Sequence, residues 1–461
     1  MNNETQEDDQ YLITEGYQPK LHRRLGFYSS FAISFSFMSV LMGIFANYGY
    51  MLNKAGPFGL WSWIFVGFGQ FLVSLVFAEM AGRIPLTGAL YNWNLKLHNQ
   101  TIGWLVGWLL VFAYTIAYAG VMVVMMAPLQ SLLGQELSIN TIRVVGISIF
   151  LLILLINIYG IRLAAYINKT AVTAEIIAIF FFGLVLAGIV FFKGEMHPEL
   201  LVTLPQGGVT YLSAFLMSSL LGAWTLFGFE TPADLSEETL NAKRVTPRGI
   251  VYSVLACTVL GFLLAAIVTI AIPDLTAITA STDPVSSIIL YHLGYFPTMM
   301  FLCIVIVSIF ASSLLSITTA SRVIYAMARD RRLFGHALFS RISHRGVPAT
   351  AAVVATAIEI VFFLVFYGQT ALFAAPVVLL YLTYLITVVG FALKSNRLPP
   401  TDAFSLGKWF WPVTVLATLW LVAEICILTV PQEFHPTAII AGGVILCALL
   451  QYGAQYIFLK K

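Results

Sequence analysis

Among the carboxylic acids that lie inside long apolar stretches of this sequence, two are best placed to do chemistry. Glu230 stands in the run GFETP at 228–232, where glycine and proline should interrupt a helix, and Glu175 lies in the apolar stretch 170–192. An ionisable side chain inside a membrane is costly, so it usually marks a path for a proton, an ion or a substrate. The alternative is structural, with Glu230 holding amides freed by the break and Glu175 paired with a hydroxyl of a neighbouring helix.

Other residue patterns argue against an enzyme or a channel. The seven histidines fall in loops or at helix ends, and the four cysteines show no metal or redox spacing. An enzyme would need a nucleophile with a base, or a metal motif such as His-Glu-x-x-His, which the sequence lacks. A channel would need a filter loop or rings of repeated charge. We therefore expect no enzyme, no metal site and no cofactor other than a coupling ion.

The elements that position the two acids are predicted to be membrane helices. Hydrophobic residues make up 59% of the chain and charged residues 10%, whereas soluble domains have about 45–50% and about 25%. The apolar runs are continuous and long enough to span a bilayer, so an all-α polytopic membrane protein is expected and a barrel is not. The twelve predicted spans are 27–52, 61–81, 102–133, 144–161, 170–192, 211–231, 249–272, 296–327, 347–367, 371–393, 410–429 and 437–459.

The basic residues predict the orientation of these helices. With the N-terminus in the cytosol, all of the 24 lysines and arginines except Lys54, Arg143 and Lys193 fall on the cytosolic side. One helix more or fewer would destroy this asymmetry. We therefore predict a multi-pass protein of the bacterial cytoplasmic membrane with both termini in the cytosol.

Interruptions in two helices predict an internal repeat. The first helix carries Gly43 and then Asn47-Tyr48-Gly49, and the sixth carries the run 228–232. Each begins a block of five helices, and because five is odd the two blocks would be inverted relative to each other. Matching broken helices point to the binding site of a transporter. The predicted parts are a disordered cytosolic tail at 1–25, repeat 1 at 26–193, repeat 2 at 206–394, and helices 11 and 12 with a short cytosolic end at 408–461.

Three stretches resemble motifs of the amino acid–polyamine–organocation (APC) superfamily, and the amino acid/choline branch that includes GABA permeases resembles them most. The resemblance runs from the first helix to the twelfth. It implies the five-plus-five inverted-repeat, LeuT-like fold, with helices 11 and 12 outside it. The three stretches are GFETPADLSEET at 228–239, FAEMAGRIPLTGALYNW at 77–93 and SRVIYAMARD at 321–330.

The resemblance also implies site residues. The segment WTLFGFE at 224–230 is similar to that of the arginine–agmatine antiporter, in which it supplies a gating tryptophan and a proton-sensing glutamate. Trp224 would then close over the substrate, and Glu230 would be the titrating group. The breaks in helices 1 and 6 would contact the substrate. The substrate-binding residues expected on this basis are Ser39, Gly43, Ile44, Trp224, Thr225, Phe227, Gly228 and Phe229.

The chain departs from the family pattern at several positions. Many members have Gly-Ser-Gly before Ile-Phe in helix 1 and hold the substrate carboxylate with its amides, whereas this chain has LMGIF at 41–45. Some proton-coupled members carry a lysine in helix 5, where Glu175 reverses the sign and could bind a proton or a cation. Ser312 and Ser313 stand where sodium-coupled members place hydroxyl ligands, although hydroxyls more often pack helices.

The function expected from these observations is secondary active transport of an amino acid or related small amine, of the neutral amino acid or GABA class, by alternating access. Proton-coupled import is the favoured energetics, with Glu230 and Glu175 as coupling residues and sodium as the less favoured ion. The alternatives are an organic-cation carrier for choline or a polyamine, and an exchanger. The expected partners are the small-molecule substrate and the lipid bilayer, without nucleic acid. No sequence signal indicates a particular oligomeric state.

Overall fold

The computed structural model describes residues 10, 12–14, 23, 25–159, 161–203, 208–343, 345–398, 400–401 and 403–459, without the side chains of 161–165, 208–209 and 455–459. Most of the predicted tail at 1–25 therefore lies outside the described residues. The spanning elements are α2 (Phe27–Met38) with α3 (Val40–Ala55), α4 (Trp61–Arg83), α6 (Gln100–Leu133), α7 (Ile139–Tyr159), α8 (Ile161–Lys193), α10 (Gly208–Met217) with α11 (Leu220–Thr225) and η2 (Thr231–Glu238), α12 (Ala242–Ile270), α15 (Tyr295–Arg329), α17 (Ala349–Phe366), α18 (Ala371–Lys394), α19 (Phe410–Ile427) and α20 (His435–Leu459). Short helices connect them, namely η1 (Pro57–Leu60), α5 (Ala89–Leu97), α9 (Glu199–Val202), α13 (Leu275–Thr279), α14 (Pro284–Leu293), α16 (His336–Phe339), η3 (Ser395–Arg397), η4 (Gly407–Trp409) and η5 (Gln432–Phe434).

The chain is an all-helical membrane protein, and the helix count depends on how one broken helix is treated. Within the described residues, 11 helical segments are long and apolar enough to cross a membrane, and α2 and α3 together form one of them. The sixth predicted helix is divided into α10, α11 and η2, none of which reaches spanning length alone. It accounts for the difference between 11 and the predicted twelve.

The two blocks of five helices pack in the manner of a LeuT-like inverted repeat. Helices that hold the same place in each block contact each other: α4 packs against α12, α6 against α15, and α7 against α17. The halves of the broken helices also pair, with α2 against η2 and α3 against α11. In contrast, α19 packs on α4 and α18, and α20 packs on α18 and α6, outside the repeats.

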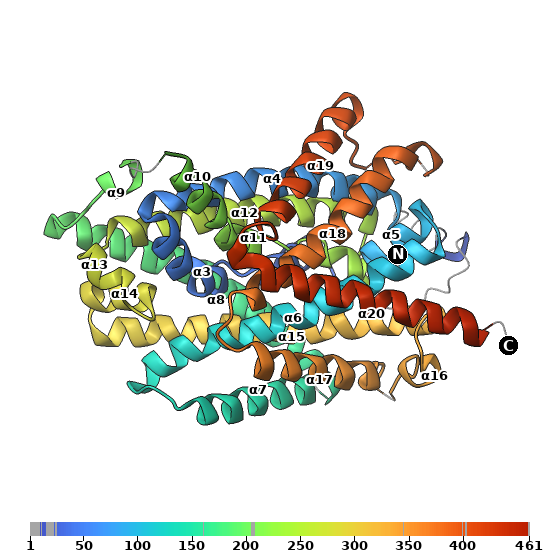
Figure 1. Cartoon of the computed structure of the whole chain (residues 1–461), viewed down its shortest axis with the longest axis horizontal. Coiled ribbons are helices and arrows are strands. Elements are labelled where there is room, and N and C mark those ends of the chain that lie inside the picture. The colour runs from blue at the N-terminus through green and yellow to red at the C-terminus, as the bar shows by residue number, and fades with distance from the viewer. Residues whose placement is uncertain are drawn as a thin grey trace.

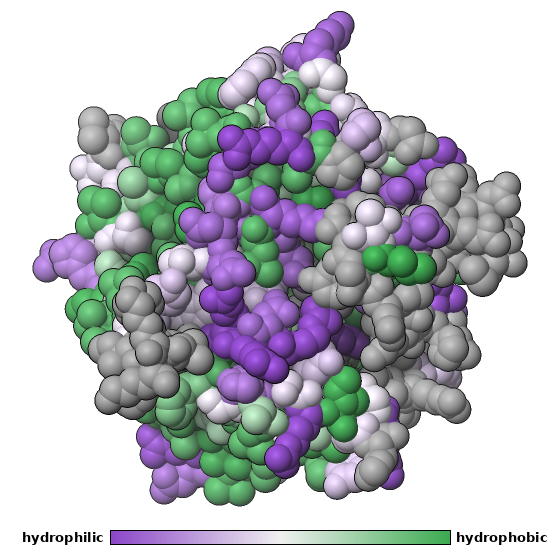
Figure 2. Space-filling view, turned by 90° about the vertical axis from the view of Figure 1, so that its right-hand side faces the viewer, coloured by the Kyte–Doolittle hydropathy of each residue, from purple (hydrophilic) through white to green (hydrophobic). Residues whose placement is uncertain are grey.

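The long helices run along the long axis of the molecule, which gives it two distinct ends (Figure 1). The short helices α9, α13 and α14 lie at one end, and α5 and α16 lie at the other. We call the latter the basic end, because α5 carries Lys96 there and the loops carry Arg331, Arg332, Arg341 and Arg345. Hydrophilic residues gather in the middle of this end face (Figure 2). Along the sides, leucines such as Leu184 and Leu419 are exposed, as a lipid-facing surface requires.

Candidate functional site

The first spanning helix is broken at Ser39. This residue has φ 38° and ψ 101°, a conformation that residues other than glycine rarely adopt. Its hydroxyl accepts a hydrogen bond from the Met42 amide (3.4 Å) and donates one to Oε1 of Glu175 (2.9 Å). The Leu41 amide donates to the same carboxyl oxygen at 3.0 Å. A glutamate from α8 therefore caps the N-terminus of α3, which is the hydroxyl pairing that the structural alternative predicts for Glu175.

The sixth helix is broken between α11 and η2, and the break requires a glycine. Gly228 has φ +79°, and a Cβ on it would lie 2.1 Å from the ring of Phe37. Both the backbone conformation and the close approach of the aromatic ring therefore exclude a side chain here. The Gly228 amide donates to the hydroxyl of Tyr384 (2.9 Å), and the Thr231 hydroxyl donates to the Gly228 carbonyl.

Glu230 joins this break to two other helices. Its side chain is 1% exposed. The hydroxyl of Tyr114 in α6 donates to Oε1 at 2.9 Å, and the hydroxyl of Tyr384 in α18 donates to Oε2. Since Tyr384 also accepts from the Gly228 amide, one phenol bonds both the carboxyl and the backbone of the break. Any change in the charge of Glu230 would alter contacts among three helices.

The two breaks lie directly against each other. A Cβ on Gly43 would lie 2.0 Å from Oγ1 of Thr225, so α3 and α11 approach as closely as these two residues allow. Phe37, in the last turn of α2, packs edge-on against Phe227 and Tyr114, with centroid separations of 6.2 and 5.6 Å. These residues bring the predicted halves of the substrate site together.

The remaining aromatic residues of the sixth helix lie on either side of the break. Phe229 packs against Tyr384 (centroids 5.4 Å apart), and its carbonyl accepts from the Ser34 hydroxyl (3.1 Å). Trp224 lies between Phe227 and Phe373, with centroid separations of 6.2 and 5.5 Å. The Trp224 ring is 1% exposed, and its Nε1 has no hydrogen-bond partner within the described part of the chain.

Of the two predicted cation ligands, Ser312 links two helices and Ser313 bonds within its own helix. The Ser312 hydroxyl shares its one proton between the Ser36 carbonyl at 2.7 Å and the Ser308 carbonyl at 3.0 Å, and the bond to Ser36 joins α15 to α2 just before the break. Ser313 donates to the Ile309 carbonyl within its own helix. Among the described residues, no group of three or more His, Cys, Asp or Glu side chains could hold a metal ion.

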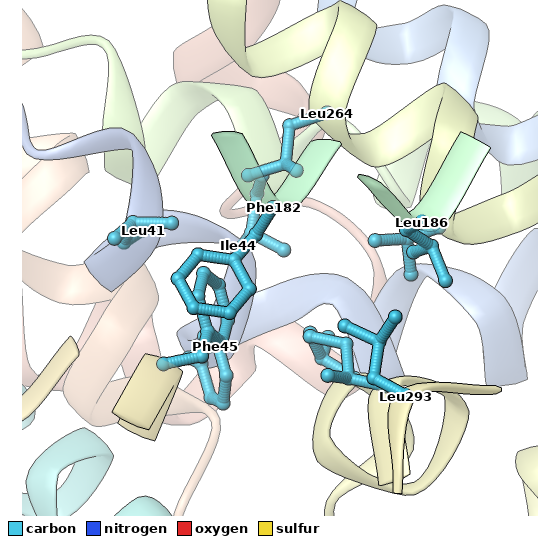
Figure 3. Close-up of a pocket in the computed structure, with 11 residues that line it drawn as sticks. Leu41, Ile44, Phe45, Phe182, Leu186, Leu264 and Leu293 are labelled. Atoms are coloured by element: carbon cyan, nitrogen blue, oxygen red, sulfur yellow. The ribbon is translucent and has the colours of Figure 1, made fainter. Parts of the chain in front are cut away.

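Ile44 lines an apolar pocket on the side of α3 that faces α8 and α14 (Figure 3). The side chains drawn there are entirely carbon, and Leu41, which follows the break, is among them. This pocket therefore offers contacts to hydrocarbon groups and no polar recognition.

A second pocket opens at the basic end. It has a cavity volume of about 270 Å³ and lies among α2, α8, η2 and α15. The Arg322–Glu238 ion pair (3.4 Å) is part of its wall. The hydroxyl of Ser36 donates to Asn168, a wall residue, at 2.5 Å. Because Ser36 lies three residues before the break at Ser39, the pocket leads from the basic end toward the candidate site. Its wall consists of Leu25, Ser29, Ala32, Ile33, Asn168, Lys169, Leu235, Glu238, Leu314, Leu315, Thr318 and Arg322.

The sequence analysis missed Tyr384, Phe37 and Ser36, which contribute to the breaks. A signal existed for Tyr384, because Tyr381 and Tyr384 are spaced three residues apart within an apolar helix and so share one face. The rings of these two tyrosines stack with centroids 5.9 Å apart. Nothing in the local sequence distinguishes Phe37 or Ser36 from other residues of α2.

Comparisons with known proteins show the family to which the chain belongs. The family model described as amino acid permease matches residues 25–448. The amino-acid permease BAT1 of Arabidopsis thaliana is 25% identical over 92% of this chain and 88% of its own length. The branched-chain amino acid permease BcaP of Lactococcus lactis is 26% identical, covering 78% and 79%. The thiamine transporter thi9 of Schizosaccharomyces pombe is 23% identical, covering 96% and 85%.

A solved structure resembles the whole chain. The manganese transporter of Eremococcus coleocola, crystallised as a mutant, superposes with a TM-score of 0.57 over 95% of this chain and 97% of its own. At 15% identity, this likeness concerns the fold alone. These relatives are permeases and transporters rather than enzymes.

Proposed function

Since the chain belongs to the amino acid permease family, we propose that it is a secondary active transporter for an amino acid or related small amine of the neutral amino acid or GABA class. It works by alternating access in the cytoplasmic membrane, with both termini in the cytosol. The substrate binds at the paired breaks of the first and sixth helices, under Trp224. The observation that supports this best is the direct contact of the two breaks around Gly43, Thr225 and Phe37.

Transport is coupled to proton import through Glu230. The carboxyl group is buried and bonded by hydroxyls of α6 and α18, while its own backbone belongs to the broken helix. Protonation converts an acceptor-only carboxylate into a group that can also donate, so it rearranges these bonds. The broken helix and its two neighbours can thereby change their relative position when the proton arrives or leaves.

Sodium is the less favoured coupling ion. The hydroxyl of Ser312 is engaged with two carbonyl groups, one of them from α2, and Ser313 is engaged within its own helix. A cation between α2 and α15 would have to separate the Ser312–Ser36 pair first.

A second candidate is an organic-cation carrier or an amine exchanger. It is favoured by Glu175, which occupies the Leu41 amide that could otherwise hold a substrate carboxylate. One relative is named a thiamine transporter, and thiamine carries a fixed positive charge and no carboxylate.

Uptake into proteoliposomes tests the proposal. Thermal shift of the purified protein against neutral amino acids, GABA, choline and polyamines first identifies ligands, since a ligand that binds only the folded state raises its stability. We expect an amino acid or GABA to shift unfolding, and its uptake to follow an inward proton gradient and to stop with a protonophore. Uptake that needs a counter-substrate inside and ignores the gradient would indicate exchange. Failure of every compound to bind or move would refute the proposed substrate class.

A further inference from the structure

The N-terminus of α3 at the helix break is an anion-binding position that is already filled. The first amides of a helix lack partners within the helix, and its N-terminal end attracts negative charge. In α3, the Leu41 amide donates to Oε1 of Glu175 (3.0 Å), the Met42 amide to the Ser39 hydroxyl (3.4 Å), and the Gly43 amide to the Ser39 carbonyl (3.0 Å). These three amides are therefore all engaged.

Glu175 is held firmly in this position. The same oxygen also accepts from the Ser39 hydroxyl at 2.9 Å, and the side chain is 1% exposed. A carboxyl oxygen can accept both bonds whether or not the group is ionised, so the contact does not depend on its protonation. On another side, Thr225 lies so close to Gly43 that a Cβ on this glycine would be 2.0 Å from its Oγ1.

We propose that Glu175 is a specificity-determining residue, a built-in carboxylate that takes the place of a substrate carboxylate at the helix break. This inference rests on the proposed function and narrows its substrate class to amines recognised chiefly through their ammonium group. A substrate carboxylate brought to these amides would compete with Glu175 for the same donors. An ammonium group meets no such competition, because the nearby acid Glu230 and the aromatic rings around Phe37 attract cations.

The test uses matched pairs of ligands on the purified full-length protein. The pairs are L-leucine with 3-methylbutylamine and GABA with propylamine, which differ only by the carboxyl group, and butyrate serves as the des-amino analogue of GABA. For the wild type we expect the two members of a pair to compete for the substrate site with apparent affinities within about threefold of each other. Butyrate should compete poorly. For Glu175→Ala we expect the ratio of the two apparent affinities to shift toward the carboxylate-bearing member by about tenfold or more, because the Leu41 amide becomes free for a charge-assisted hydrogen bond.

Three further variants keep the test decisive. Glu175→Gln retains an acceptor oxygen and should keep the wild-type ratio, and Glu359→Gln changes another fully buried membrane glutamate, from α17, as a matched control. If Glu175→Ala does not fold, Glu175→Asp provides the measurement, because its shorter side chain draws the oxygen away from the Leu41 amide and should move the ratio in the same direction.

The outcomes separate this inference from the proposed function. If no amine or amino acid binds or is transported, the proposed function fails. Amines could be transported while a ligand that lacks the carboxyl group competes more than about thirtyfold more weakly on the wild type than its carboxylate-bearing partner. In that case the substrate carboxylate is bound elsewhere, and the inference on Glu175 is wrong. An unchanged ratio in both Glu175→Ala and Glu175→Asp would also overturn it.

Discussion

Glu230 is the residue on which the proposed coupling depends. Glu230→Gln keeps the size of the side chain and an acceptor for Tyr114 but cannot titrate. For proton-coupled import, wild-type uptake should rise as the pH outside falls below that inside. The variant should still bind substrate but lose most of this pH dependence. The change in its uptake rate between the lowest and highest outside pH should be about tenfold or more smaller than in the wild type. The measurement is initial uptake in proteoliposomes at several outside pH values. A variant that matches the wild type at every pH would exclude the proton role.

Trp224 is the residue proposed to close over the substrate. Its ring packs between Phe227 and Phe373, and its Nε1 is buried. Trp224→Ala should lower substrate affinity by about tenfold or more, because it removes a large buried contact area. Trp224→Phe retains an aromatic ring and should lose less. Binding by thermal shift and yield of folded protein are measured together, and unchanged affinity in Trp224→Ala would remove this residue from the site.

At this scale, residue types predicted the site only in part. Glu230, Gly228 and Trp224 stood out because glycine, proline, acids and a tryptophan gather within a few positions of an apolar chain. Tyr384 was not predicted, since its role depends on α18 passing beside the sixth helix, and that contact spans 154 residues of sequence. Glu175 was identified as a candidate, but its partner amide could be known only from the three-dimensional arrangement.

At the scale of elements, α4 and α12, which hold the same place in the two blocks of helices, pack closely against each other. A Cβ on Gly67 would lie 2.3 Å from Cγ2 of Thr258 but 3.2 Å from its Cβ. Gly67→Ala should therefore lower the free energy of unfolding by about 1–3 kcal/mol, because the added methyl overpacks the contact with Thr258. Thr258→Ala removes the opposing methyl and a hydroxyl that has no partner within the described residues. It should be near neutral alone.

The double variant provides the control for this pair. Gly67→Ala combined with Thr258→Ala should recover most of the lost stability, measured by thermal unfolding of the purified protein in one detergent. Additive effects of the two substitutions would show that the residues do not oppose each other, because non-additivity is the signature of contacting sites.

Helix positions were predictable from the sequence because the membrane demands long apolar runs with internally satisfied backbones. The predicted spans 61–81 and 371–393, for example, correspond to α4 (Trp61–Arg83) and α18 (Ala371–Lys394). The exact form of the breaks was not predictable. The first break falls at Ser39, before the glycines that drew attention to it, because Glu175 supplies a cap from a distant helix.

At the scale of the whole molecule, the charge distribution and the pocket at the basic end indicate which side is open. The pocket of about 270 Å³ reaches from that end to Asn168, beside the break, whereas the pocket on the other side of the break is apolar and lined by closely packed side chains. The structure is therefore more accessible from the basic end, which we predict to face the cytosol because lysine and arginine are in excess there.

Cysteine labelling tests this accessibility and the orientation together. In a variant with the four native cysteines replaced, Ser29→Cys lies in the wall of the pocket, and Ile44→Cys lies beyond the break in the apolar pocket. A membrane-impermeant thiol reagent should label Ser29→Cys from the cytosolic side, in inside-out vesicles, at least about tenfold faster than from the outside, because a lipid bilayer bars the charged reagent. Ile44→Cys is the matched control and should react slowly from both sides, since its side chain is 1% exposed. Arg322→Ala removes the ion pair to Glu238 in the wall of the pocket and should speed the labelling of Ser29→Cys further. Labelling of Ser29→Cys from the outside alone would reverse the predicted topology, and equal rates at positions 29 and 44 would show that the pocket at the basic end is not the open side.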